Sequence, residues 1–224
     1  MHRRIATVLF FALAACAADP GEGKPKAVVE DVPAKKAEAP KPAAPAAPAA
    51  APAAPAAAGD MWAVDVSKSK IEALGAKVTA QHPVVFKEFT GKVGVSNNTI
   101  AQLEFEVKMA SLEADHPKLT EHLKAPDFFD IAQFPTATFK STEVKAGSAE
   151  AGMTHTVTGE FSIRGTTKKI TFPAKVAVAG TSVDASTEFV INRKDFGIVY
   201  PGKPDDLIKD NVKMTIQLVA AKPG

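Results

Sequence analysis

The sequence is poor in the residues that cross-link small exported domains or carry out catalysis. Its 224 residues include a single cysteine, Cys16, so no intramolecular disulfide can form. The sequence contains no Gly-x-Ser-x-Gly, no His-Glu-x-x-His and no phosphate-binding glycine motif. The histidines are scattered. A metal site that joins His116, His122 and Asp127 is the alternative to exposed or helix-capping roles for these residues. We therefore predict no enzymatic activity, no catalytic residue, no metal site and no cofactor.

Neither sign of charge is in excess. The first 60 residues hold seven of the 27 basic and six of the 25 acidic side chains, which leaves 20 basic and 19 acidic side chains for the rest. Nucleic-acid binding requires a clear basic excess on one surface. The sequence therefore predicts no nucleic-acid partner.

The first 16 residues resemble a bacterial lipoprotein signal peptide. Arg3 and Arg4 precede an apolar run of ten residues, which is too short to span a bilayer. The run ends in Leu13-Ala14-Ala15-Cys16, which resembles a lipobox. We predict that Cys16 is acylated and becomes the N-terminus after cleavage. The alternative is an ordinary signal peptide with a chance cysteine.

Residues 17–59 are dominated by proline and alanine, and Pro-Ala-Ala recurs along them. Such a segment has too few large apolar groups to offset the entropy lost on ordering. We predict a disordered tether over 17–59 and one folded domain over 60–224. The absence of an aspartate directly after Cys16 is typical of lipoproteins sorted to the outer membrane, so the expected location is the periplasm, with a lipid anchor in that membrane.

The domain reads as a series of short strands with one interruption. Residues 100–109 alternate strictly between apolar and polar side chains, and Asn97-Asn98 before them is a turn signal. Similar alternation recurs over 153–164, 168–178, 183–192 and 212–218. Residues 119–132 have helical spacing instead, until Pro135 ends the helix. These patterns predict an all-β fold, an eight-stranded (or nine-stranded) antiparallel barrel with a short helical insert.

The inward-facing positions of these strands are the candidate binding residues. A barrel of eight strands is wide enough either to fill with side chains or to hold one small ligand, and alternation does not separate the two cases. The predicted lining is Leu103, Phe105, Val107, Phe139, Phe161, Ile163, Phe172, Phe189, Ile191, Met214 and Ile216. The insert supplies a predicted lid of Leu123, Phe128 and Phe129.

Several motifs in order resemble the YceI-like family. They are the run from Gly75 to His82, HLKAPDFFDIAQFPTATF from His122, the run from Val157 to Lys168, Phe172-Pro173, and Ile191-Asn-Arg-Lys-Asp-Phe-Gly197. The resemblance implies a periplasmic or secreted lipocalin-like barrel that binds a polyisoprenoid or a similar long apolar chain.

Taken together, the sequence predicts a membrane-tethered periplasmic protein that sequesters a polyisoprenoid, quinone or fatty-acid-like chain inside a barrel. The expected partners are that lipid and, through the acylated N-terminus, a membrane. The alternative is an envelope interaction module whose barrel is solid and whose loops bind a protein.

Overall fold

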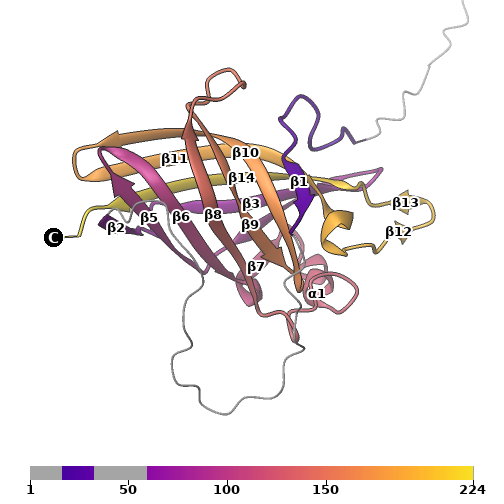
Figure 1. The fold of residues 1–224 in the computed structure, drawn as a ribbon. Coiled ribbons are helices and arrows are strands. Elements are labelled where there is room, and N and C mark those ends of the chain that lie inside the picture. The colour runs from indigo at the N-terminus through magenta and orange to yellow at the C-terminus, as the bar shows by residue number, and fades with distance from the viewer. Residues whose placement is uncertain (1–16, 33–59, 224) are drawn as a thin grey trace, which may run out of the picture.

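The computed structural model describes residues 17–32 and 60–223 (Figure 1). Eight strands close an antiparallel ring, and neighbours in the ring follow one another along the chain. The predicted all-β fold and eight-stranded barrel are therefore confirmed. The strands of the ring are β2 (Asp60–Val64), β5 (Phe89–Ser96), β6 (Thr99–Lys108), β8 (Thr136–Ala146), β9 (His155–Ile163), β10 (Thr166–Ala179), β11 (Ser182–Asn192) and β14 (Asn211–Ala221).

Tight turns set the register of the hairpins. Asn97 and Asn98 have φ of 50° and 59°, the left-handed values that a two-residue hairpin turn requires. They join β5 to β6, and Phe105 then lies opposite Gly91 on one side and Phe139 on the other. The alternation of β6 thus points Leu103 and Phe105 inward.

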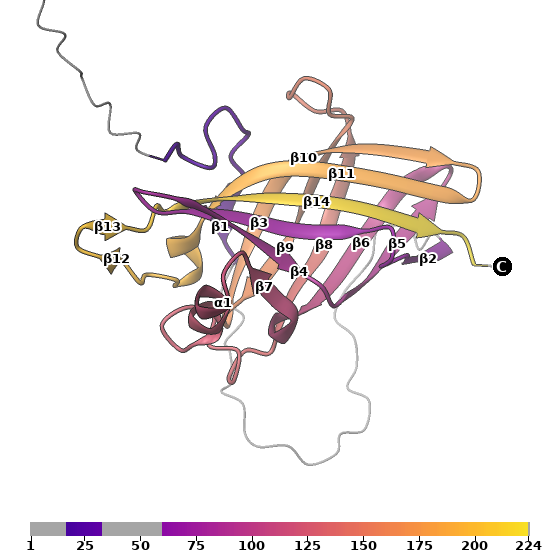
Figure 2. The same cartoon turned by 180° about the vertical axis from the view of Figure 1, so that it is seen from behind.

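The ring is wider at one end than at the other. β14 pairs with β2 only through Ala220 and Ala221, and over 213–217 it pairs with β3 (Lys70–Ala76) instead. β3 continues into β4 (Gln81–Phe86) and β4 pairs with β7 (Leu112–Ala114). These three strands extend the wall at the wide end, where α1 (Pro117–Lys124) also lies (Figure 2).

The helical insert is shorter than predicted. α1 ends at Lys124, and residues 126–129 form turns rather than a continued helix. Pro126 explains the early end, because a proline pushes the preceding residue out of the helical region, and Ala125 has ψ of 165°. The short helices η1 (Met109–Ser111) and η2 (Arg193–Phe196) and the hairpin of β12 (Gly202–Lys203) and β13 (Asp206–Leu207) complete this end.

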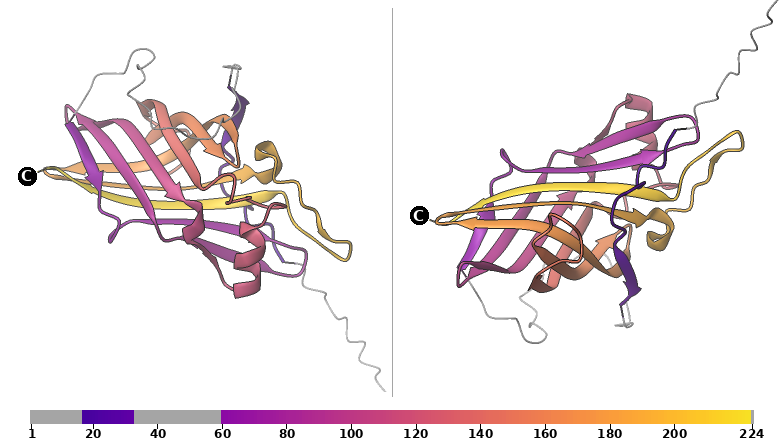
Figure 3. Two further views of the ribbon diagram at one scale, coloured as in Figure 1. Left: turned by 90° about the horizontal axis from the view of Figure 1, so that it is seen from below. Right: turned by 90° about the horizontal axis from the view of Figure 1, so that it is seen from above.

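Residues 17–32 differ from the predicted disordered tether. They cross the outside of the barrel (Figure 3) as a segment that we call the N-terminal strap, and β1 (Val28–Asp31) within it pairs with β10. Pro20 and Gly21 are buried, and a Cβ on Gly21 would lie 2.7 Å from Val190 Cγ2. Residues 1–16 and 33–59, with the predicted signal peptide, Cys16 and the rest of the tether, lie outside the described residues.

The strap packs there because two neighbouring strands diverge. β10 pairs with β11 only over 175–179, so its residues 168–171 have a free edge that β1 occupies. On the other side of the gap, Val190 N–H donates to Pro25 O (2.9 Å) and Ala27 N–H donates to Val190 O (2.8 Å). The strap therefore supplies backbone partners to both strands and covers the apolar Val190, which faces outward between the inward-facing Phe189 and Ile191.

We predict that Gly21→Ile destabilises the domain, because the new side chain must push the strap away from Val190. Overpacking of this kind costs about 1–3 kcal/mol, and each kcal/mol lowers the melting temperature by roughly 2–4 °C in a chain of this size. Glu22→Ile, at the exposed neighbouring position, is the control and should melt as the parent does. Equal melting temperatures for both variants, measured by circular dichroism, would show that the strap contributes nothing.

Candidate binding cavity

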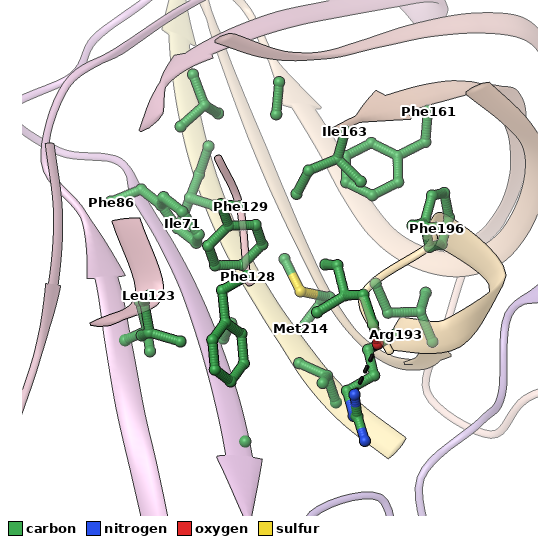
Figure 4. Close-up of a pocket in the computed structure, with 18 of the residues that line it drawn as sticks. Ile71, Phe86, Leu123, Phe128, Phe129, Phe161, Ile163, Arg193, Phe196 and Met214 are labelled. Carbon is green, nitrogen blue, oxygen red and sulfur yellow. Dashed lines mark hydrogen bonds between the residues drawn. The ribbon is translucent and has the colours of Figure 1, made fainter. Parts of the chain in front are cut away.

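The wide end of the barrel is hollow. An apolar cavity of about 200 Å³ lies between the ring strands, β3, β4 and the insert (Figure 4). An apolar cavity of roughly 150 Å³ is enough to hold a benzene-sized molecule. The interior at this end is therefore large enough to admit a small apolar molecule.

Ten of the eleven predicted lining residues border this cavity. The exception is Leu103, which lies beyond Phe105 and borders a second cavity of about 30 Å³. The three predicted lid residues also face the large cavity. That these side chains bind a lipid stays a prediction, whereas their position around the cavity is a structural fact.

The predicted lining omitted one wall. Ile71, Val84 and Phe86 on β3 and β4 face the cavity, together with Phe196, Ile198 and Ile208 from the loops near η2. The alternation of Val84 and Phe86 in the sequence indicates that these two side chains share a face of their strand, so this part of the wall could have been predicted. The loop residues gave no such signal, because their position depends on how η2 folds back over the wide end.

A layer of phenylalanine rings closes the inner end of the cavity. The ring centroids of Phe105 and Phe139 are 6.1 Å apart, those of Phe139 and Phe172 5.6 Å, and those of Phe172 and Phe189 4.4 Å. Gly159 makes room for the layer, since a Cβ there would lie 2.5 Å from Phe139 Cζ. Beyond the layer lies the small second cavity of about 30 Å³.

The insert covers the cavity as a lid held by polar contacts. Arg164 reaches across from the β9–β10 turn and donates to Pro126 O (2.9 Å) and to Gly197 O (2.6 Å). Lys124 Nζ donates to Ala110 O (2.7 Å). The lid is thus attached to both η2 and η1 while its apolar side chains face inward.

An aromatic cluster joins the lid to the loop after η2. The His122 ring lies edge-on to Phe128 and to Tyr200, each at a centroid distance of 5.0 Å. His122 Nε2 is 2.5 Å from Asp127 Oδ2, so two members of the metal alternative do meet. Among the described residues, however, no three His, Cys, Asp or Glu side chains are placed to hold a metal ion.

Arg193 is the buried cation at the cavity wall, with 5% of its side chain exposed. Its guanidinium donates to the carbonyl oxygens of Ile198 (2.6 Å), Lys209 (3.1 Å) and Ile208 (3.3 Å). Asp210 lies 3.1 Å away. Burial lowers the pKa of Arg193, and Asp210 opposes that shift. These contacts use its donors to fasten two loops, so the site offers a ligand mainly apolar surface.

The geometry defines a class: an antiparallel barrel with a lidded apolar cavity at one end. The YceI-like domain family model matches residues 62–220, so the chain belongs to the YceI-like family and the resemblance seen in the sequence is confirmed.

Similar proteins agree with that assignment. UPF0312 proteins of Pseudomonas fluorescens and Pseudomonas putida are 29% and 31% identical, over 58% and 52% of this chain and 70% and 64% of theirs. BcnA of Burkholderia cenocepacia has a similar structure, with a TM-score of 0.63 and 26% identity over 70% of this chain and 99% of BcnA. A polyisoprenoid-binding domain of Saccharophagus degradans shares the fold, with a TM-score of 0.59 and 13% identity over 72% of this chain and 98% of that domain.

Phe105 lies between the large cavity and the small one and borders both, as Phe172 and Ile216 also do. We predict that Phe105→Ala joins them and shifts binding toward longer apolar chains, at a cost of about 3 kcal/mol in the free energy of unfolding. Leu103→Ala, on the same face of the same strand but away from the large cavity, is the matched control. It should cost about 2–5 kcal/mol and leave the chain-length preference unchanged. Denaturant unfolding and a binding series of fatty acids and polyprenols measure both effects.

Proposed function

We propose that this protein binds a long apolar lipid in the periplasm, without catalysing a reaction, while anchored to the outer membrane through acylated Cys16. The observation that carries the proposal is the lidded apolar cavity of about 200 Å³. Burial of apolar surface contributes roughly 25 cal/mol per Å². A lipid tail packed against these walls therefore needs few polar contacts in order to bind. The similarity to a polyisoprenoid-binding domain supports an isoprenoid-type chain.

The cavity also suggests how the ligand lies. Lys77 and Lys209 border it near the β3–β4 connection, while the phenylalanine layer closes the other end. The apolar tail would therefore enter toward the phenylalanines and leave any polar end near the lysines. The wall is mostly aliphatic and aromatic, so it should discriminate only weakly between chains that differ by one methylene.

The alternative function, an interaction module with a solid barrel, requires a packed interior. The interior is packed only beyond the phenylalanine layer, and the hollow half counts against this alternative. Within residues 17–32 and 60–223, no helix is long and apolar enough to cross a membrane.

Gly75 offers a clean test of lipid binding. It borders the cavity, β3 runs straight through it, and a Cβ there would meet no atom within 4 Å. We expect Gly75→Leu to fill the cavity and abolish lipid binding without loss of stability, since glycine in a strand is roughly 0.5–1 kcal/mol worse than alanine.

Native mass spectrometry of the purified chain checks this prediction by counting co-purified lipid. Gly75→Ala is the control, because it adds a methyl group to the same wall and should keep the lipid. Full lipid occupancy in Gly75→Leu would contradict binding in this cavity.

The anchor has a separate test. We expect Cys16→Ser to release the protein from the membrane fraction, because stable attachment takes two or more acyl chains. Fractionation of cells followed by immunoblotting measures the release. If the serine variant stayed in the membrane fraction, the acylation proposal would fail while lipid binding in the cavity could still hold.

A further inference from the structure

The first described residues are fixed at the wide end of the barrel. Ala17 N–H donates to Val78 O (2.9 Å), and Lys209 Nζ donates to Ala17 O. Gln81 Nε2 donates to Ala18 O (3.0 Å). Lys209 also borders the cavity, so the start of the strap lies beside the place where the polar end of a ligand is expected.

The same end carries a group of exposed apolar side chains that we call the apolar rim. It consists of Val78 in the β3–β4 connection, Leu207 in β13 and Val199 after η2, with 37%, 49% and 63% exposure. Six large apolar side chains are exposed in the described part of the chain, and half of them are here. Val66 lies at the other end of the barrel, since Asp65 N–H donates to Val219 O (2.8 Å) in the last part of β14 (Figure 1).

The rim is held together by backbone and ionic contacts. Val78 N–H donates to Leu207 O (3.1 Å), and Lys77 Nζ is 2.8 Å from Asp206 Oδ2. Asp206 also accepts from Thr79 Oγ1 (2.9 Å), and with Lys77 these contacts lower its pKa. These contacts link the β3–β4 connection and β13, and the hydrogen bond from Ala17 N–H to Val78 O adds the start of the strap.

We propose that the apolar rim docks on the surface of the bilayer and holds the cavity end against the membrane. The inference rests on the proposed acylation of Cys16. Cys16 is the covalent neighbour of Ala17, with about 3.8 Å between successive Cα atoms, and Ala17 is hydrogen-bonded to Val78 of the rim. Residues 33–59 follow the strap in the chain, so they do not lie between the anchor and the barrel.

A bilayer suits the rim better than a charged partner does. Lys77 pairs with Asp206, and Lys203 and Lys209 lie among Asp205 and Asp210 in the same stretch of chain. Neither sign of charge is in clear excess, so the attraction is apolar rather than electrostatic. Lysine stems lie along apolar surface while the amines stay in the head-group region. Docking should therefore depend little on anionic lipid or salt. A chain leaving the bilayer would enter the cavity without crossing water.

The test uses the full acylated chain, in which a new cysteine is the only free thiol because Cys16 carries the lipid. Leu207→Cys places a fluorophore on the rim, and Val66→Cys, with 44% against 49% exposure, places one at the opposite end. Both proteins are reconstituted into phosphatidylcholine vesicles that contain a lipid-borne quencher. We expect severalfold stronger quenching at position 207 than at position 66.

Two further variants distinguish docking through the rim from a barrel that is only tethered to the membrane by a flexible segment. Lys209→Met removes the contact to Ala17 O and should reduce the difference between the two labels. Deletion of residues 36–55 should leave that difference unchanged, because this segment lies outside the path from anchor to rim. Equal quenching of both labels in acylated protein would overturn rim docking and leave the anchor in place. Mass spectrometry showing no acyl group would instead overturn the anchor, and rim docking with it.

Discussion

Backbone pairing around a ring that widens is the constraint on which this structure depends. Strand edges with free N–H and C=O groups recruit other chains and are covered in native proteins. At the narrow end the ring closes through Ala220 and Ala221. At the wide end β10 leaves β11 and β14 leaves β2 for β3, and the strap and the β3–β4 hairpin take the freed positions. Widening with these freed positions occupied is what produces an interior cavity.

The phenylalanine layer divides the barrel into two parts with different roles. Beyond the layer, Trp62, Val93 and Val183 are buried, and burial of this kind supplies most of a domain's stability. On the lid side the same strands border empty space. The fold can thus keep a cavity of about 200 Å³ at one end because the buried side chains at the other end stabilise it.

The sequence predicted the ring well and the space inside it poorly. Alternation in residues 100–109 pointed Phe105 and Val107 inward because side-chain direction in a strand is a local property. Whether Phe105 meets another ring or a void depends on the distance between opposite strands, which no local pattern encodes. The strap was missed because the composition of residues 17–59 was averaged, which hid Pro20 and Gly21 near its start. Val190, apolar on an outward position, was the one signal that something covers the barrel there.

The position of β1 also dictates an order of events. Val28 pairs with Thr171 and Lys26 bridges to Val190, so the strap is made first but its partners come last. Contacts between such distant parts of a chain form late because loop closure must precede them. Until β10 and β11 exist, residues 26–31 of the strap have no strand edge to pair with. Pairing of the strap with β10 and β11 therefore marks the completion of folding and brings residues 26–31 onto the barrel.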